Sequence, residues 1–415
     1  MRSGRFRLVL VVAICACSAA FAGGRQASFH GLGSLPGGPF SSMATGVSAD
    51  GTVVVGMSPE IGTEWPRPFI WTAATGMRNL QDLAGTNDPR LAFGISGDGT
   101  SVVGAATETF AGEWHSYRWS QAQGYWNLRD FQGGADYSHA RATSYDGSVV
   151  VGFGSNDNGI EAYRWTQETG PVGLGDLPGG SYGSFAWGVS ADGSVVVGSS
   201  FGFGGDNIEQ AFRWTAETGM VGLGGLVDFP ATSIANGISP DGSTIVGNAY
   251  SHSSGGGFEA WRWTKSGGME GLGDLPGGHF DSGANAASTN GDVIVGYGST
   301  TAGYEAFVWD EAHGMRNLRA VLVADCGLDL SGWRLESATA LSSDGQTIVG
   351  YGYDSAGYEE GWIATLPEPS AVWLLAIGAV VFRSRSSRSL ALRTASEFCR
   401  SVRLASTACR AESRA

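Results

Sequence analysis

Residues 187–198, with the sequence WGVSADGSVVVG, decide the fold. An Asp-Gly pair there separates two runs rich in β-branched residues. This pattern is typical of a β-hairpin, because Gly accepts positive φ and Asp bonds its own turn. Residues 211–215 (AFRWT) are predicted to form a third strand, and residues 220–226, which contain Gly-Leu-Gly, a weaker fourth strand. The local unit is therefore expected to be a four-stranded antiparallel sheet.

The same unit recurs seven times along the body of the chain. One register is a tryptophan, at Trp71, Trp119, Trp165, Trp214, Trp263, Trp309 and Trp362. A second is the turn, at residues 50–51, 98–99, 146–147, 192–193, 241–242, 290–291 and 344–345, with Asn290 in place of Asp once. A third is a Val-Gly pair after each turn, from Val55-Gly56 to Val349-Gly350. Seven agreeing copies, without a sustained helical period, predict an all-β fold: a single seven-bladed β-propeller with nearly no helix. A β-solenoid is the alternative, but its coils are shorter and lack three internal hairpin turns.

The two ends of the array are offset within the repeat. It opens at residues 31–38, a fourth-strand motif, and closes at residues 360–364, a third-strand motif. We therefore expect the N-terminal strand to complete the last blade, which closes the ring and hides both sheet edges.

Charge and cysteine content exclude several classes of function. Of the 415 residues, 67 are Gly and the net charge is −14. Residues 23–366 hold 14 basic and 36 acidic side chains, a net charge of −22, which argues against a nucleic-acid partner. Within that body Cys326 is the one cysteine, so an internal disulfide and a CxxC-type metal site are excluded.

Residues 1–22 have the features of an export signal. Arg2, Arg5 and Arg7 precede an apolar run, and Ala20 and Ala22 supply the small residues that signal peptidase requires before cleavage at Gly23. An uncleaved membrane anchor is the alternative, although the apolar run is short for one.

The C-terminal segment has the features of a second targeting signal. Pro367-Glu368-Pro369 precedes an apolar stretch within residues 370–382, followed by Arg383, Arg385 and Arg388. This order resembles the PEP-CTERM sorting signal of bacterial exported proteins. The resemblance implies tethering in the inner membrane through residues 370–382, with the body facing the periplasm. It also implies an exosortase as processing partner and a final location at the cell surface or outside the cell. A chance linker before a tail is the alternative interpretation. Residues 367–388 are thus assigned to sorting, and residues 389–415 to a basic tail expected to be disordered.

The body resembles the HAF repeat of bacterial extracellular proteins. Residues 173–180 and 271–278 both read GLGDLPGG, residues 188–198 match the turn motif, and residues 211–214 match the Ala-Phe-x-Trp motif. The resemblance spans residues 31–363 and implies extracellular location. It brings no enzymatic activity and no catalytic residues, so no enzyme activity is expected.

Few residues of the body suggest site chemistry. No cofactor is expected; calcium is the alternative, at the loops of residues 157–159 and 206–207. Aromatic residues outside the repeat register are candidates for a ligand face: Trp65, Trp114, Tyr250 and Tyr304.

Three functions from different classes are consistent with the sequence. The first is a non-catalytic surface or matrix protein that acts as a scaffold or adhesion module. The second is a carbohydrate-binding propeller whose partners are exopolysaccharide or other surface glycans, which an exposed set of aromatic residues on one face would favour. The third is a glycosidase or lyase, which paired carboxylates at the channel mouth would favour.

Overall fold

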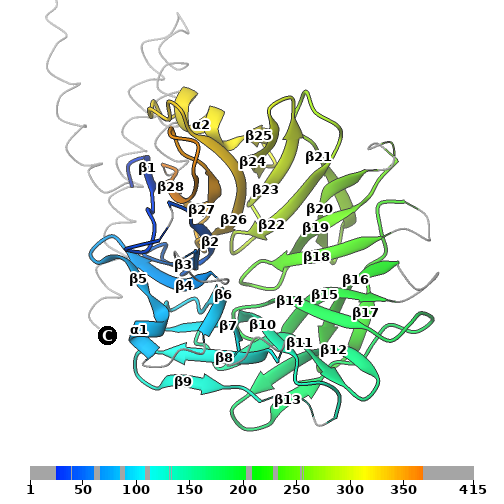
Figure 1. The fold of residues 1–415 in the computed structure, drawn as a ribbon. Coiled ribbons are helices and arrows are strands. Elements are labelled where there is room, and N and C mark those ends of the chain that lie inside the picture. Colours follow the sequence, from blue (N-terminus) through cyan, green and yellow to red (C-terminus); the bar gives the residue numbers. More distant parts are fainter. Residues whose placement is uncertain are drawn as a thin grey trace, which may run out of the picture. The chain divides into compact units, whose positions relative to one another are not determined.

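The computed structural model describes residues 25–38, 40–59, 66–84, 89–107, 113–129, 131, 133–201, 208–227, 232–252, 255 and 257–367. They belong to one compact unit, Arg25–Pro367. Its sheets form the seven-bladed, four-stranded β-propeller that the repeat predicts (Figure 1). In the part of the chain described here, no helix is long and apolar enough to cross a membrane.

Six blades are continuous in sequence, each running from the innermost to the outermost strand. Blade 1 comprises β2 (Met43–Val47), β3 (Val53–Ser58), β4 (Arg67–Thr72) and β5 (Gly76–Asn79). Blade 2 comprises β6 (Pro89–Ile95), β7 (Ser101–Ala106), β8 (His115–Ser120) and β9 (Gly124–Asn127). Blade 3 comprises β10 (Ser138–Thr143), β11 (Val149–Asn156), β12 (Gly159–Thr166) and β13 (Gly170–Gly173). Blade 4 comprises β14 (Ser184–Val189), β15 (Val195–Phe201), β16 (Glu209–Thr215) and β17 (Gly219–Gly222). Blade 5 comprises β18 (Ser233–Ile238), β19 (Thr244–Tyr250), β20 (Phe258–Thr264) and β21 (Gly268–Gly273). Blade 6 comprises β22 (Ser282–Ala287), β23 (Val293–Thr300), β24 (Gly303–Asp310) and β25 (Gly314–Asn317).

Blade 7 joins the two ends of the body, as the offset of the array predicts. It contains β26 (Arg334–Leu341), β27 (Thr347–Tyr353), β28 (Glu359–Thr365) and, outermost, β1 (Ser28–Gly31). The register runs from Ser28 opposite Thr365 to Gly31 opposite Trp362. Phe29 packs its ring against Trp333 and Trp362, at centroid distances of 4.9 and 6.3 Å. Both the backbone ladder and this aromatic contact therefore close the ring.

The position of the Gly-Leu-Gly motif differs from the prediction. The Gly-Leu-Gly motif lies mostly after the outer strand: β17 ends at Gly222, and β1 lies before residues 31–38 rather than within them. The motif is a connection between blades, because its Gly and Pro residues favour turns over strand pairing.

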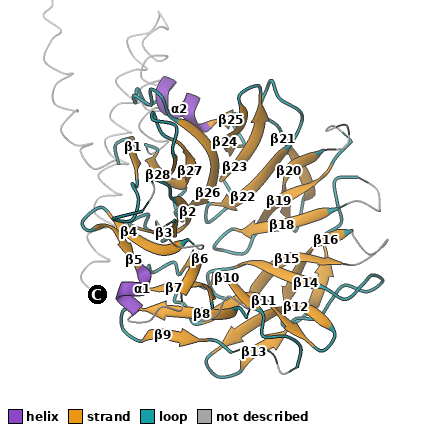
Figure 2. Ribbon diagram, viewed as in Figure 1, coloured by secondary structure: helices purple, strands orange, loops and turns teal. Residues whose placement is uncertain are grey.

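In the described residues the structure contains two short helices, in agreement with the prediction of nearly no helix. The helices α1 (Leu80–Ala84) and α2 (Leu318–Ala324) follow the outer strands of blades 1 and 6 (Figure 2). Here Asn-Leu replaces the Gly-Leu-Gly motif. The side-chain oxygens of Asn79 and Asn317 accept hydrogen bonds from Gln81 N and Ala320 N, and such caps favour a helical start.

The tryptophan register is wrong in its seventh copy. Trp309 pairs with Ile294, but the corresponding Ile348 of blade 7 pairs with Ala364. Trp362 lies two residues earlier, opposite Gly350, and is fully buried. It belongs to a second aromatic column, whose members are Phe69, Tyr117, Tyr163, Phe212, Trp261, Phe307 and Trp362.

This second column explains the glycine of the Val-Gly pair. Each of its aromatic rings lies over a glycine of the second strand, such as Gly198 beneath Phe212. A Cβ on Gly198 would be 2.9 Å from the Phe212 ring and would overlap the carbonyl oxygen of Phe185. Any larger residue is therefore excluded by backbone on one side and an aromatic ring on the other.

The Asp-Gly turns have the expected chemistry within a four-residue loop. Ser190 N donates to Val195 O at 2.9 Å, and Gly193 has φ +71°. The Asp192 carboxylate accepts hydrogen bonds from the Ser190 hydroxyl at 2.6 Å and from Ser194 N at 3.0 Å. These bonds hold the pKa of Asp192 below its usual value.

Adjacent turns are also linked by backbone hydrogen bonds. Six junctions of the ring have such a bond: Ala49 N to Gly97 O, Asp98 N to Tyr145 O, Tyr145 N to Ala191 O, Ala191 N to Pro240 O, Thr289 N to Ser343 O and Ser343 N to Ala49 O. At the junction of blades 5 and 6 the corresponding residue is Pro240, which has no N–H to donate. Hydrogen bonds thus connect the turns of successive blades around the ring, except at the junction that follows Pro240.

Candidate functional site

The innermost strands place one variable side chain per blade in the central channel. Each of these strands shifts register by one residue immediately after a buried alanine, for example between Ala186 and Gly188 of β14. Such β-bulges leave one residue unpaired and redirect its side chain. The unpaired residues, which we call the channel ring, are Thr45, Phe93, Arg141, Trp187, Asn236, Asn285 and Thr339, and all of them line a channel of about 550 Å³.

Four members of the channel ring connect neighbouring blades. Thr45 Oγ1 donates to Ala92 O of blade 2 at 2.9 Å, and Thr339 Oγ1 donates to Ala44 O of blade 1 at 2.9 Å. Two further bonds of the same kind run from Asn236 Nδ2 to Ala284 O at 3.0 Å and from Asn285 Nδ2 to Ala338 O at 2.8 Å. These four side chains are satisfied within the protein and have a structural role.

The other three members stack on one another. The Arg141 guanidinium lies 4.0 Å from the Phe93 ring centroid and 4.8 Å from that of Trp187. These three residues come from β6, β10 and β14, which are neighbours at the centre of the molecule (Figure 1). Burial lowers the pKa of the Arg141 guanidinium to about 10, so it stays charged at neutral pH.

An aromatic layer adjoins this part of the ring. His139 stacks on Phe153 at 5.3 Å with an interplanar angle of 15°, and Phe185 stacks on Trp187 at 5.9 Å and 10°. Phe153 contacts Phe185 edge-on at 5.0 Å. Burial, with the nearby charge of Arg141, lowers the pKa of His139 to about 4, so the imidazole is neutral at neutral pH. Blades 2 to 4 therefore present stacked aromatic rings beside one cation.

The structure separates the aromatic residues that the sequence suggested. Trp114 contacts the ring of His139 at 5.6 Å, at the edge of the aromatic layer. Tyr250 stacks on Phe258 in blade 5 at 4.5 Å. Tyr304 of blade 6 packs edge-on against Tyr297, a channel residue, at 5.5 Å. Trp65 lies outside the described residues. The three described residues stand at or between the second and third strands of their blades, but each ring has different neighbours.

Tyr304 is also held by a carboxylate. Its hydroxyl donates to Asp281 Oδ2 at 2.6 Å, and this bond raises the pKa of Tyr304 to about 12.

The loop of residues 157–159, a predicted alternative calcium site, contains no cluster of metal-binding side chains in the described structure. Asp157 Oδ1 accepts a hydrogen bond from Gly134 N at 3.2 Å, and Asp206 and Asn207 lie outside the described part of the chain. No group of three His, Cys, Asp or Glu side chains there is arranged to hold a metal ion.

Most residues of the two address signals also lie outside the described residues. They are Ala20, Ala22, Gly23, Glu368, Pro369, Arg383, Arg385 and Arg388. Pro367, the first residue of the sorting motif, is the last one described. Leu366 just before it donates its N–H to Gln346 O at 2.8 Å.

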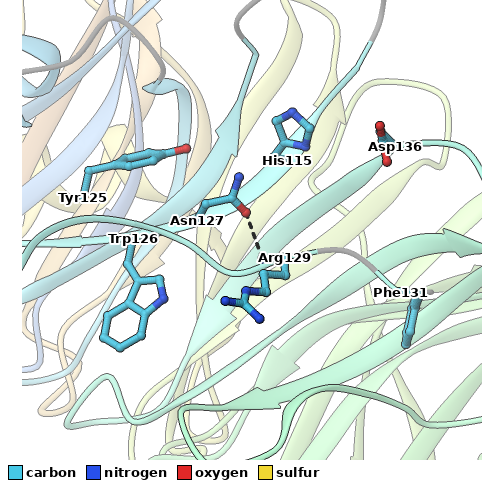
Figure 3. Close-up of a pocket in the computed structure, with 7 residues that line it drawn as sticks. All are labelled: His115, Tyr125, Trp126, Asn127, Arg129, Phe131 and Asp136. Atoms are coloured by element: carbon cyan, nitrogen blue, oxygen red, sulfur yellow. Dashed lines mark hydrogen bonds between the residues drawn. The ribbon is translucent and has the colours of Figure 1, made fainter.

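A second cavity, of about 760 Å³, lies away from the channel, beside the outer strands of blade 2 (Figure 3). In this view the Arg129 side chain extends toward Trp126, while Asp136 and Phe131 lie on the opposite side. Arg129 has φ +63°, and its N–H donates to Asn127 Oδ1 at 2.8 Å. We favour the channel as the functional site, because all seven blades converge on it.

The channel ring was missed by the sequence analysis. Its signal is a variable position between two constant ones: every copy has Ala before it and Ser three residues after it, as in Ala186-Trp187-Gly188-Val189-Ser190. These residues lie inside strands, whereas the aromatic residues predicted to bind a ligand lie in or near loops of the sequence pattern.

Fold and channel together define a seven-bladed β-propeller whose central channel is lined by one variable residue from each blade. No protein-family model and no curated protein matches the chain. Similar solved structures include an oligogalacturonate lyase in complex with manganese, at 14% identity and a TM-score of 0.51, covering 84% of this chain and 98% of that one. A prolyl endopeptidase is similar at 12% identity and a TM-score of 0.51, covering 78% of this chain and 49% of that one. TolB from Acinetobacter baumannii shows 13% identity and a TM-score of 0.43, with 77% and 81% covered. At such identities the likeness concerns the fold alone.

Proposed function

We propose that this protein is an exported, non-catalytic surface or matrix protein whose propeller binds a glycan at the channel, so that it acts as an adhesion module. The observation that carries the proposal is the pair of channel-lining rings Phe93 and Trp187, which adjoin further stacked rings on blades 2 to 4. Aromatic faces combined with a few polar groups are typical of sites for small polar ligands, and the channel volume of about 550 Å³ suits one.

The structural role of the other ring members supports this assignment. Thr and Asn residues tie the blades together at four junctions, whereas Phe93, Arg141 and Trp187 use the same position without such bonds. A polar residue at this position can therefore bond to the adjacent blade. Blades 2 to 4 instead have Phe93, Arg141 and Trp187 there, which form no such bond. Departures from a local rule are expected where function requires them.

The proposal includes the cellular location of the protein. Export by the signal at residues 1–22 and sorting by a PEP-CTERM-type segment would bring the HAF-like body to the cell surface, where glycans are abundant. The supporting observations are the sequence patterns at both ends and the tryptophan-rich repeat.

Cell fractionation tests the proposed export and sorting of the protein. An epitope tag after Gly23 is followed in the wild type and in Val380→Asp, which adds about 2.5–3.5 kcal/mol to the insertion of the apolar run. We expect the wild type in the membrane and surface fractions, and the variant released with its C-terminus unprocessed. Cytoplasmic location of both proteins would refute export.

Glycan binding is tested on an array with the protein and two tryptophan variants. Trp187→Ala removes an aromatic face from the channel, and Trp126→Ala removes an exposed ring from the outer cavity. We expect Trp187→Ala to lose its glycan signals while Trp126→Ala retains them. Loss in Trp126→Ala alone would move the site to the outer cavity.

A further inference from the structure

The Arg141 guanidinium is a charged group without an ionic partner in the described structure. Among the described residues that line the channel, it is the one charged side chain. No described carboxylate lies within salt-bridge distance of it, and no described group accepts a hydrogen bond from it. The rings of Phe93 and Trp187 contact it, and Tyr137 and His139 lie close enough to interact with its charge.

The Arg141 side chain lines the channel, where its hydrogen-bond donors are accessible to a ligand. A carboxylate that reaches them would add charge-assisted hydrogen bonds to the existing cation–π contacts. Neutral residues fill the corresponding position elsewhere, such as Thr45 and Asn285, and they bond to the adjacent blade. A neutral residue such as Thr or Asn would therefore be sufficient at position 141 for folding.

The geometry also limits the form of the ligand. The Arg141 guanidinium contacts the rings of Phe93 and Trp187, and the N–H groups of a guanidinium point outward along the edge of its plane. A carboxylate meets that edge with two parallel hydrogen bonds, as a planar, singly charged partner. Phosphate carries more charge than one guanidinium neutralises, and the body of net charge −22 repels multiply charged anions.

We propose that the channel binds an acidic saccharide, with the carboxylate of a uronic acid on Arg141 and the sugar ring against the indole of Trp187. This inference rests on the proposed function, because it names the ligand class of that same site. The sugar's C–H faces would lie against this indole while the carboxylate replaces the missing ionic partner.

Matched disaccharides test the proposal. Cellobiuronic acid and cellobiose differ in one carboxylate, and their binding to protein purified from cells expressing the full-length chain is measured by calorimetry. We expect cellobiuronic acid to bind at least tenfold more tightly than cellobiose, as is usual for a charge-assisted pair of hydrogen bonds. Sodium acetate and sodium sulfate at the same concentration should compete weakly, because they lack the sugar ring.

Three variants assign the effect to Arg141. Arg141→Gln should bring cellobiuronic acid to the affinity of cellobiose, and Arg141→Lys should give an intermediate value because lysine keeps the charge but loses the fork. Arg213→Gln removes the same charge from β16, outside the channel lining, and should leave binding unchanged. Thermal melting checks folding: we expect Arg141→Gln to melt at or above the wild-type temperature, because it removes an unpaired charge.

The possible failures are distinguishable. Equal binding of the two disaccharides, unaffected by Arg141→Gln, would overturn the carboxylate site and leave a glycan-binding channel. A lower melting temperature of Arg141→Gln with unchanged binding would assign Arg141 a structural role and also overturn the proposal. Competition by acetate or sulfate as strong as that of the acidic sugar would overturn the saccharide part. Binding of no disaccharide, together with an empty glycan array, would refute the proposed function itself.

Discussion

Replacement of Gly198 by alanine should strongly destabilise the propeller. The new methyl group would overlap Phe185 O and lie 2.9 Å from the Phe212 ring, and neither neighbour is the free end of a flexible side chain. The inner strand β14 must therefore move away from β15. Overpacking of a core costs about 1–3 kcal/mol, and we expect the upper end of this range because a backbone carbonyl blocks the site.

Gly219→Ala is the matched control for this replacement. Gly219 has φ +65° and no neighbouring atom within 4 Å of a Cβ, so alanine there costs about 1 kcal/mol of backbone strain without overlap. Both variants are Gly→Ala changes, so the effect on the entropy of the unfolded chain is the same. The difference between the two variants therefore equals the packing cost at Gly198 minus the backbone strain of about 1 kcal/mol at Gly219.

The assay is urea unfolding followed by tryptophan fluorescence. At constant m-value, the midpoint of Gly198→Ala should fall well below that of Gly219→Ala, by the equivalent of about 2 kcal/mol. Because Phe185 belongs to the aromatic layer, Gly198→Ala should also weaken glycan binding. Equal midpoints for the two variants would refute the packing explanation of the Val-Gly register.

Three further predictions concern ring closure, pH and blade contacts. Deletion of residues up to Gly31 should lower the melting temperature markedly, because it removes β1 and exposes the edge of β28; an unchanged melting curve would contradict closure by this strand. Since the pKa of His139 is lowered to about 4, the unfolded chain takes up a proton near pH 6.5 while the folded one does not. Stability should thus fall by about 2 kcal/mol between pH 7 and 4.5, and urea unfolding of His139→Phe should lack this part of the pH dependence. Asn285→Ala should cost about 1 kcal/mol in the same assay, because Ala338 O loses its hydrogen-bond donor.

The sequence predicted the architecture because its repeats carry redundant signals. A turn glycine at positive φ, a Val-Gly pair and an aromatic third strand occur in every copy, so one misaligned member, Trp362, did not alter the count of blades. The offset of the array likewise predicted that the N-terminal strand closes blade 7, although β1 lies a few residues earlier than expected.

The site was less accessible to sequence reasoning, for a physical reason. Phe93 and Arg141 are 48 residues apart in the sequence, and Arg141 and Trp187 are 46 residues apart. They meet because bulges in three neighbouring strands turn them into the channel. A bulge depends on the pairing of two strands and has no marker in either strand alone. Comparison of the seven copies, position by position, would have shown that this position varies between a constant Ala and a constant Ser.

The strand pairing of blade 7 determines how the propeller would respond to tension on its ends. The chain leaves the body through Ser28 and Thr365, which are paired at the same end of one antiparallel ladder. Tension applied between the two ends would open this ladder one residue pair at a time, and that is the weakest direction in which to load it. Tension applied through Thr365 alone acts on a strand bonded along both edges, to β1 and to β27, so many hydrogen bonds share the load in shear. A propeller held by its C-terminal end would therefore bear force well, and removal of β1 would lower its rupture force more than its affinity for a ligand.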